Sequence, residues 1–258
     1  MDIFCIDIGN THTHFGIVKT EGAPEPSRIE TQTIDDPDGQ LAREIAAFSQ
    51  EKEAPAFAFC SVSPDATRRL EAFFNKMGLR ESLFQLTSDA RLGMKISYPK
   101  PEEIGQDRLA NAIAATALYP LPCIVIDLGT AATFDIVTAS GGYEGGTIAP
   151  GIRIMTEYLH EQTAQLPRLG EDFSVDGAIG HSTSEAMRIG CVIGFGGMIQ
   201  ALFDAVVKEL QARGESEPTV VATGGAAKFL QAPLRQRIID APGITLQGLA
   251  LAYRLNRC

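Results

Sequence analysis

The chain has 258 residues, 45% of them hydrophobic, and a formal net charge of −10. That hydrophobic content is sufficient for a packed core, so the composition excludes a largely disordered chain. The acidic charge, without any run of Lys and Arg, opposes binding to a nucleic-acid backbone, and we expect no nucleic-acid partner. The length favours two closely associated domains.

The cysteines and the N-terminal segment indicate the cellular compartment. Four of the five cysteines lie in apolar runs, where a thiol behaves as a small hydrophobic group. No two have the spacing of metal ligands: Cys5, Cys60, Cys123, Cys191 and Cys258. The segment Met1–Asp7 lacks the positive region and long apolar stretch of a signal peptide. We therefore expect a cytoplasmic protein with reduced thiols.

The first predicted element is a β-hairpin. The apolar run Ile3–Ile6 leads into Asp7-Ile8-Gly9-Asn10-Thr11, and a second apolar run follows at Phe15–Val18. Glycine in such a turn lets a phosphate approach backbone N–H groups, and Asp7 could hold Mg²⁺, usually through water. His12 and His14 have the spacing of a metal pair but no third ligand, so we expect exposed or ligand-near positions.

Strands and helices then alternate. The acidic, polar stretch Glu21–Gln40 is expected to be a surface excursion. A strand is predicted at Ala56–Val62 and a helix at Ala66–Met77, followed by a helix over Gln106–Leu118, where apolar residues recur on one face. This alternation indicates α/β layers.

The start of the helix at Gln106–Leu118 carries Gly105-Gln106-Asp107-Arg108, after the rigid extended stretch Tyr98–Pro101. One interpretation is a helix N-terminus with a surface ion pair, since an acidic residue in the first turn is common. The other makes Asp107 a general base that takes a hydroxyl proton. Arg108 would then orient substrate or stabilise transferred charge.

The hairpin pattern returns in the middle of the chain. Cys123–Ile126 leads into Asp127-Leu128-Gly129-Thr130-Ala131, and Phe134–Val137 follows. Asp and Gly are common in plain β-turns, but two copies, each after an apolar strand and rich in Thr, favour a pair of phosphate-binding hairpins. Asp127 could then hold a second cation. The repeat, 120 residues from Asp7 to Asp127, suggests two homologous half-domains.

Two later segments allow two interpretations each. Gly145–Gly151 is dense in Gly and Pro, and is either a bare loop or a place where backbone approaches a ligand. A long helix predicted over Ser184–Gln211 contains the most apolar stretch, Ile189–Val207. Gln200 and Asp204 interrupt that stretch, so we expect a buried helix whose glycines permit close packing rather than a membrane span.

The last predicted motif is a strand, Thr219–Ala222, that runs into Thr223-Gly224-Gly225, with a helix to follow. Such an arrangement opens a helix N-terminus towards a ligand. The chain has no Gly-x-x-x-x-Gly-Lys-Ser/Thr loop and no Gly-x-Gly-x-x-Gly spacing, which excludes P-loop and Rossmann nucleotide sites.

In this order the motifs resemble those of the type III pantothenate kinases, in the superfamily of acetate kinase, hsp70 and actin. The resemblance covers nearly the whole chain. It places the family's first phosphate motif at Asp7–Thr11, its Gly-x-Asp-Arg motif at Gly105–Arg108 and its second phosphate motif at Asp127–Thr133. The further matches are Tyr98 and Pro101, Gly145–Gly151, Leu166-Pro167 and Thr223–Gly225.

The resemblance implies an α/β fold of two actin-like (ribonuclease H-like) half-domains, residues 1–118 and 119–258, each a mixed sheet flanked by helices. It implies transfer of phosphate from ATP to the 4′-hydroxyl of pantothenate, the first step towards coenzyme A, with Asp107 as general base. The implied pantothenate contacts are Tyr98, Gly105, Gln106, Asp107, Arg108 and Thr183. The implied ATP contacts are Asp7, Ile8, Gly9, Asn10, Thr11, Gly129, Thr130, Ala131, Thr133, Thr223, Gly224 and Gly225.

The resemblance also implies Mg²⁺ near Asp7, through water, and a monovalent cation, K⁺ or NH₄⁺, at Asp127. It implies a homodimer with the pantothenate pocket at the interface, where Thr183 comes from the partner subunit, and no membrane partner. The family's Asn-Thr pair reads Ser182-Thr183 here, a departure that bears on fine pocket geometry.

Two other functions fit parts of the pattern. A regulator resembling Bvg accessory factor, acting on transcription without catalysis, could lose Asp7 or Asp107, and this chain keeps both. A phosphatase or exopolyphosphatase of the same superfamily would share the Asp-Gly hairpins but would not need Gly-x-Asp-Arg after a Tyr-Pro stretch. The residues favour the kinase.

Overall fold

The computed structural model describes residues 1–20, 22–226 and 238–257. The chain divides into two compact units. The first comprises Met1–Leu121, Val137–Gly145 and the segment from Ala241 onward; the second comprises Pro122–Ile136 and the described part of Gly146–Asp240. The C-terminal helix thus belongs to the first unit, and the boundary at residues 118 and 119 stays a prediction about the two homologous halves.

The first unit is built on a five-stranded mixed sheet with the order β3-β2-β1-β4-β5. β1 pairs antiparallel with β2 and β2 with β3, whereas β1, β4 and β5 are parallel. The strands are β1 (Ile3–Ile8), β2 (His12–Val18), β3 (Ser27–Glu30), β4 (Phe57–Ser61) and β5 (Leu83–Gln85). The helices are α1 (Gln40–Gln50), α2 (Pro64–Lys76), α3 (Gln106–Leu118) and α6 (Ile244–Arg257), with short 3₁₀ turns at Thr31–Thr33, Arg80–Ser82 and Pro101–Glu103.

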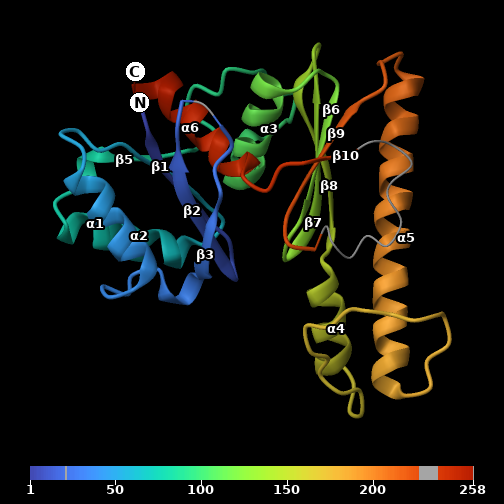
Figure 1. The fold of residues 1–258 in the computed structure, drawn as a ribbon. Coiled ribbons are helices and arrows are strands. Elements are labelled where there is room, and N and C mark those ends of the chain that lie inside the picture. Colours follow the sequence, from blue (N-terminus) through green and yellow to red (C-terminus); the bar gives the residue numbers. More distant parts are fainter. Residues whose placement is uncertain (21, 227–237, 258) are drawn as a thin grey trace. The chain divides into compact units, whose positions relative to one another are not determined.

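Side-chain alternation along β1 and β4 gives this sheet two different faces. Phe4, Ile6 and Ile8 join Phe57 and Phe59 in a buried core with apolar residues of α1 and α2. The intervening residues, which include Asp7 and Cys60, point to the opposite face, where α3 and α6 pack (Figure 1). The carboxylate of Asp7 therefore lies on the side of the sheet covered by α3.

The second unit repeats this plan. Its sheet has the order β10-β9-β6-β7-β8, and β6, β9 and β10 are parallel. A link of two residues joins β6 to its neighbour β7, which requires an antiparallel pair. The strands are β6 (Cys123–Leu128), β7 (Ala131–Thr138), β8 (Gly142–Pro150), β9 (Thr219–Thr223) and β10 (Ile238–Asp240), with helices α4 (Ile152–Glu161) and α5 (Thr183–Ala212). Taken from β3 in the first sheet and from β8 in the second, the strand orders correspond: β3-β2-β1-β4-β5 matches β8-β7-β6-β9-β10. This repeat confirms the expected fold class.

Most predicted elements are confirmed with small shifts at their ends. The strand expected at Ala56–Val62 is β4, the helix expected at Ala66–Met77 is α2, and α3 has the predicted bounds. The strand at Thr219–Ala222 is β9. The helix expected after Gly225 falls mostly on residues 227–237, outside the described residues.

Two expectations were wrong. The stretch Glu21–Gln40 is not only a surface excursion, because it contains β3 and the buried side chains of Thr31 and Ile34. For Gly145–Gly151 the sequence left two interpretations open, and the structure excludes the bare loop, because residues 145–150 form most of β8.

The second wrong expectation concerns the long helix, α5, which was expected to be buried and is buried along one face only. Its glycines are largely open instead: a Cβ added to Gly190, Gly196 or Gly197 would meet nothing within 4 Å. Within the described part of the chain, α5 is the one helix long and apolar enough to cross a membrane by length and composition, a test that core helices of other proteins also pass.

Candidate active site

The first unit brings two of the predicted carboxylates to one side of its sheet. Asp7, at the end of β1, lies opposite Cys60 of β4 in the parallel register, and the Cys60 thiol donates a hydrogen bond to Asp7 Oδ1 at 3.3 Å. Burial, followed by the negative charges of Asp7 and Asp107, raises the pKa of Cys60, so the thiol stays protonated and remains a donor. Asp7 keeps contact with solvent, with 17% of its side chain exposed.

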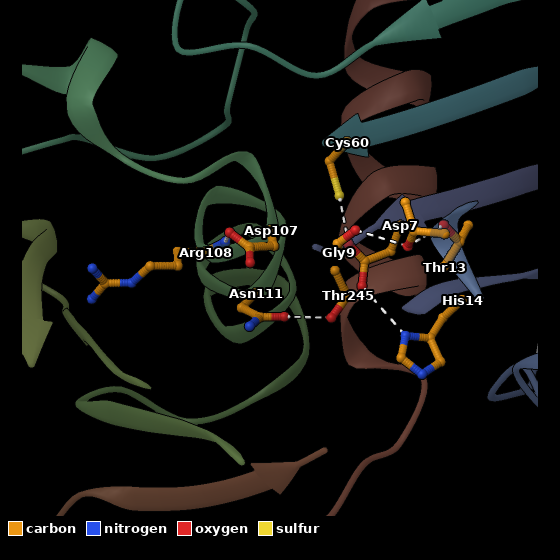
Figure 2. A network of polar contacts seen from close by, with 10 residues as sticks. Asp7, Gly9, Thr13, His14, Cys60, Asp107, Arg108, Asn111 and Thr245 are labelled. Atoms are coloured by element: carbon orange, nitrogen blue, oxygen red, sulfur yellow. Dashed lines mark hydrogen bonds and ion pairs between the residues drawn. The ribbon is translucent and has the colours of Figure 1, made fainter. Parts of the chain in front are cut away.

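Gln106 fixes the start of α3 beside these strand ends. Its Oε1 accepts hydrogen bonds from the backbone N–H of Ser61 at 2.9 Å and from Nε2 of Gln85 at 3.4 Å. The next residue, Asp107, is thereby held on the same face of the sheet as Asp7 and Cys60 (Figure 2). The predicted contact of Gln106 with substrate stays a prediction, and its observed role is to attach α3 to β4 and β5.

The glycine of Gly-x-Asp-Arg leaves room for the Asp107 carboxylate. A Cβ at Gly105 would lie 2.5 Å from Asp107 Oδ1. The same oxygen accepts a hydrogen bond from the backbone N–H of Arg108 at 2.8 Å. Burial raises the pKa of Asp107, while this hydrogen bond and the charge of Arg108 oppose the rise. The arrangement holds a partly buried carboxylate in a fixed direction and makes it a stronger base.

Arg108 points away from Asp107 and Asp7 (Figure 2). Its guanidinium carbon lies 5.9 Å from the ring centre of Tyr143, a cation–π distance. The Tyr143 ring in turn lies 6.4 Å from that of Tyr98, which packs against Gly145, where a Cβ would be 3.2 Å from the ring. Two predicted substrate contacts, Tyr98 and Arg108, therefore meet around a tyrosine that the sequence interpretation missed.

The first phosphate hairpin is a tight turn between β1 and β2. The N–H of Gly9 donates to the carbonyl of His12 at 3.0 Å, and a Cβ at Gly9 would approach that oxygen to 2.7 Å. Ile8 is buried, whereas Asn10 and Thr11 are exposed at the tip. This geometry requires glycine and leaves the backbone of the tip accessible to a ligand.

His14 of β2 faces Asp7, with 3.9 Å between Nδ1 and Oδ2. Burial, followed by the nearby charges of His12 and Arg28, lowers the pKa of His14 to about 4. The imidazole is therefore neutral at pH 7 and does not form an ion pair with Asp7. Among the described residues, no group of three or more His, Cys, Asp and Glu side chains gathers to hold a metal ion, so the two histidines do not begin a metal cluster there.

The second phosphate hairpin, in the second unit, is surrounded by close backbone. Gly129 donates its N–H to the carbonyl of Ala131 at 3.0 Å, and Gly151 donates to that of Thr130 at 3.1 Å. Gly224, with φ +91°, lies so close that a Cβ would come within 2.7 Å of Asp127 Oδ1 and 2.6 Å of Leu128 backbone. The predicted Thr223–Gly225 motif and the start of α4 thus converge on the Asp127 hairpin.

Side-chain exposure around this hairpin follows the turn. Gly129 and Thr130 are exposed, Ala131 and Thr133 are half-buried on β7, and Thr223 is buried at the end of β9. A Cβ at Gly151 would overlap the carbonyls of Gly129 and Thr130. The Gly-rich segment at Gly145–Gly151 therefore brings backbone against the hairpin at Gly151, and its approach to a ligand stays a prediction.

Thr183 begins α5, one residue after the helix cap. Ser182 Oγ accepts from the N–H of Glu185 at 3.2 Å, and Glu185 Oε2 accepts from the N–H of His181 at 2.6 Å, which is a capping box displaced by one residue. Ser and Asn cap helices about equally well. Ser182 in place of the family's Asn therefore preserves the start of the helix and the position of Thr183.

The chain is similar in sequence to proteins of one described activity. A family model described as type III pantothenate kinase matches residues 3–205. A type III pantothenate kinase of Akkermansia muciniphila is 37% identical over 257 residues, which are 99% of this chain and 100% of the relative. One from Methylacidiphilum infernorum is 38% identical over 246 residues, covering 95% of this chain and 86% of the relative.

Solved structures share the fold at low sequence identity. A protein of Campylobacter jejuni described as a Baf family transcriptional activator gives a TM-score of 0.61 at 17% identity, with 97% of both chains covered. Ethanolamine utilization protein EutJ of Carboxydothermus hydrogenoformans gives 0.55 at 14% identity, covering 97% of this chain and 89% of the other. MreB5 of Spiroplasma citri gives 0.50 at 10% identity, covering 98% and 95%.

Proposed function

This chain belongs to the type III pantothenate kinase family, and we propose that it transfers the γ-phosphoryl group of ATP to the 4′-hydroxyl of pantothenate, the first step towards coenzyme A. The observation that carries the proposal is the placement of Asp107 beside Asp7 on one face of the first sheet. Asp107 would serve there as the base for the hydroxyl and Asp7 as the carboxylate for the metal bound to ATP, and both residues belong to the first unit.

Asp107 acts as the general base. A primary alcohol is a poor nucleophile at neutral pH, and a positioned carboxylate that accepts its proton assists the transfer. Burial raises the pKa of Asp107, which increases its basicity, while the Arg108 N–H keeps one oxygen in place. The other oxygen accepts the proton of the 4′-hydroxyl.

Arg108 orients the substrate and does not stabilise the transferred phosphoryl group. Its guanidinium lies against Tyr143 and away from Asp107, and an arginine in this position suits the carboxylate at the far end of pantothenate. Tyr98 and Gly105 line the same side, and Thr183 of the partner subunit completes the contacts with pantothenate.

The two hairpins bind ATP. Each presents backbone N–H groups at an exposed tip, those of Asn10 and Thr11 in the first hairpin and that of Thr130 in the second, and such groups cradle phosphate oxygens. Thr223, Gly224 and Gly225 contact the adenosine, since the glycines there carry no side chain that would exclude it.

Two cations assist. Asp7 is a single, partly exposed carboxylate, which fits Mg²⁺ because that ion keeps several waters and is held mainly by phosphate oxygens. Asp127, half-buried beside the second hairpin, fits a monovalent K⁺ or NH₄⁺ ion. When bound, the cations supply positive charge that offsets the charge of the phosphates.

The protein forms a homodimer in the cytoplasm through α5. The exposed small residues Gly190, Gly194, Gly197 and Ala201 follow one stripe of that helix at helical spacing, which permits close approach of another helix. Beside the stripe lies an apolar hollow of about 400 Å³, lined by Met155, Tyr158, Leu159, Ala186, Met187, Gly190 and Cys191. A second copy of the chain is the partner that we propose for this surface, and Thr183 at the start of the same helix is the residue that it contributes.

The test is the release of ADP by purified protein with ATP, Mg²⁺ and K⁺, measured with and without pantothenate. The proposal requires ADP release that depends on pantothenate. A phosphatase of the same fold would release phosphate without pantothenate, and a non-catalytic regulator would release neither product.

A further inference from the structure

The tip of the first phosphate hairpin is held from behind by Thr31, which follows β3. The backbone N–H of Thr31 donates to the carbonyl of Thr11 at 2.9 Å. Its hydroxyl donates to the carbonyl of Gly9 at 2.9 Å, and lies 3.0 Å from the hydroxyl of Thr13. The carbonyls on both sides of Asn10 are therefore bonded to one residue.

The direction of these hydrogen bonds is determined by counting hydrogens. A threonine hydroxyl has a single hydrogen, and that of Thr31 is used on the Gly9 carbonyl, so the Thr13 hydroxyl must donate to Thr31. Thr13 is 0% exposed and Thr31 4% exposed, so water does not replace either bond. The result is a buried chain from Thr13 through Thr31 to the carbonyl of Gly9, of which Figure 2 labels Thr13 and Gly9.

The bond to Gly9 also sets the direction of a backbone donor. The peptide between Gly9 and Asn10 is planar and trans, so its N–H points opposite to its C=O. With the carbonyl of Gly9 turned towards buried Thr31, the N–H of Asn10 points away from Thr31, and Asn10 is exposed at the tip. That is the orientation that a phosphate oxygen requires of a backbone donor.

The pairing of β2 with β3 does not by itself impose this orientation. The strand register ends at His12 opposite Glu30, whereas Gly9 and Asn10 lie beyond it in the turn. The Thr31 hydroxyl acts on the turn alone. Loss of the hydroxyl would leave the sheet intact and release the Gly9 carbonyl.

We propose that Thr31 is a positioning residue, which orients the Asn10 N–H of the first hairpin for a phosphate group of the nucleotide. The proposal rests on the proposed function, because it deepens the role of the Gly9–Thr11 tip as a phosphate site. Thr31 does not touch the nucleotide and acts only through the backbone of Gly9 and Asn10.

The test is the affinity for ADP with Mg²⁺, measured by calorimetry without pantothenate, for wild type and three variants. Thr31→Val keeps the shape but leaves the buried Gly9 carbonyl unsatisfied, and we expect its Kd to rise about tenfold. Thr31→Ser keeps the donor and should stay within about threefold of wild type. Thr13→Val is the matched control, because it removes a buried hydroxyl of the same chain but leaves the bond from Thr31 to Gly9.

A merely structural role would lower the melting temperature of Thr31→Val and the fraction of active protein while leaving Kd unchanged. Folded Thr31→Val with a Kd within about twofold of wild type therefore overturns the proposal. If that variant does not fold, the test is the amide resonance of Asn10 in ¹⁵N-labelled wild type. The proposal requires this resonance to shift on addition of ADP and Mg²⁺, and an unmoved resonance overturns it. A wild type that binds ADP but does not phosphorylate pantothenate contradicts the proposed function and leaves this comparison valid.

Discussion

Replacing Gly105 by alanine would insert a methyl group where the carboxylate of Asp107 lies. The new Cβ would be 2.5 Å from Asp107 Oδ1 and 3.6 Å from Val62 Cγ1. Carbon and oxygen that are not bonded approach to about 3.3 Å, so the carboxylate must move by roughly 0.8 Å. Val62 would be in ordinary van der Waals contact with the methyl group, so the carboxylate is the group that yields.

A displacement of this size in a catalytic group costs on the order of 10²-fold in rate, and removal of a general base costs about 10²–10⁴-fold. We therefore expect kcat of Gly105→Ala to fall about 100-fold. The fold should survive, because Gly105 has φ −54° and ψ 135°, which alanine adopts readily. Alanine at an N-cap costs about 1 kcal/mol, or roughly 2–4 °C in Tm for a chain of this size.

The assay is a coupled measurement of ADP release at saturating ATP and pantothenate, with Tm measured on the same samples. Gly170→Ala serves as the matched control, because a Cβ at Gly170 meets nothing within 4 Å and that glycine lies outside the proposed site. If Gly105→Ala retained kcat within about threefold of wild type, the assignment of Asp107 as a base held in place by Gly105 would be refuted.

Three further predictions follow from the same geometry. Asp107→Asn should lower kcat by about 10²–10⁴-fold with ADP affinity unchanged. Because burial raises the pKa of Asp107, the charged carboxylate destabilises the fold above that pKa. The variant should therefore melt no lower than wild type near pH 8, and the difference in Tm between the two should shrink in acid, where Asp107 is protonated. Replacement of K⁺ and NH₄⁺ by Na⁺ should depress activity sharply, and equal rates in the three salts would remove the monovalent site from Asp127. Gly197→Glu, on the open stripe of α5, should convert the dimer to a 27.7 kDa species in sedimentation and abolish pantothenate-dependent activity, whereas a fully active monomer would contradict the role of Thr183.

The sequence alone predicted those candidate site residues whose positions depend on local backbone geometry. The two hairpins could be predicted because glycine is common in a turn after a buried strand, and the structure shows at Gly9 that a side chain would strike backbone. At Gly129 a Cβ would make only ordinary contacts, and the close approach to the second hairpin comes from Gly224, after β9. The helix that begins after Gly105 could be predicted because apolar residues recur on one of its faces. The attachment of this helix beside the strand that bears Asp7, through Gln106, became visible only in the structure, and the role of Asp107 as a base stays a prediction.

Other residues near the candidate site could not be identified from the sequence, because their positions depend on pairing between segments that are distant in the chain. Cys60 lies opposite Asp7 only through the register of β1 with β4, and Thr31 reaches Gly9 only because β3 pairs with β2. Tyr143 meets Arg108 because β8 returns to the first unit. The apolar and small residues of α5 show a further difficulty, since composition does not reveal whether such a face packs on its own chain.

The central claim is that this protein phosphorylates pantothenate, and detection of the product tests it most directly. Purified protein would be incubated with ATP, Mg²⁺, K⁺ and pantothenate, and the mixture examined by mass spectrometry and ³¹P NMR, with Asp107→Asn in parallel. We predict 4′-phosphopantothenate in an amount equal to the ADP formed by wild type, and a product level lower by about two orders of magnitude or more for the variant over the same time. A wild-type enzyme that splits ATP without forming this phosphate ester, or that forms none while binding ATP, would contradict the account.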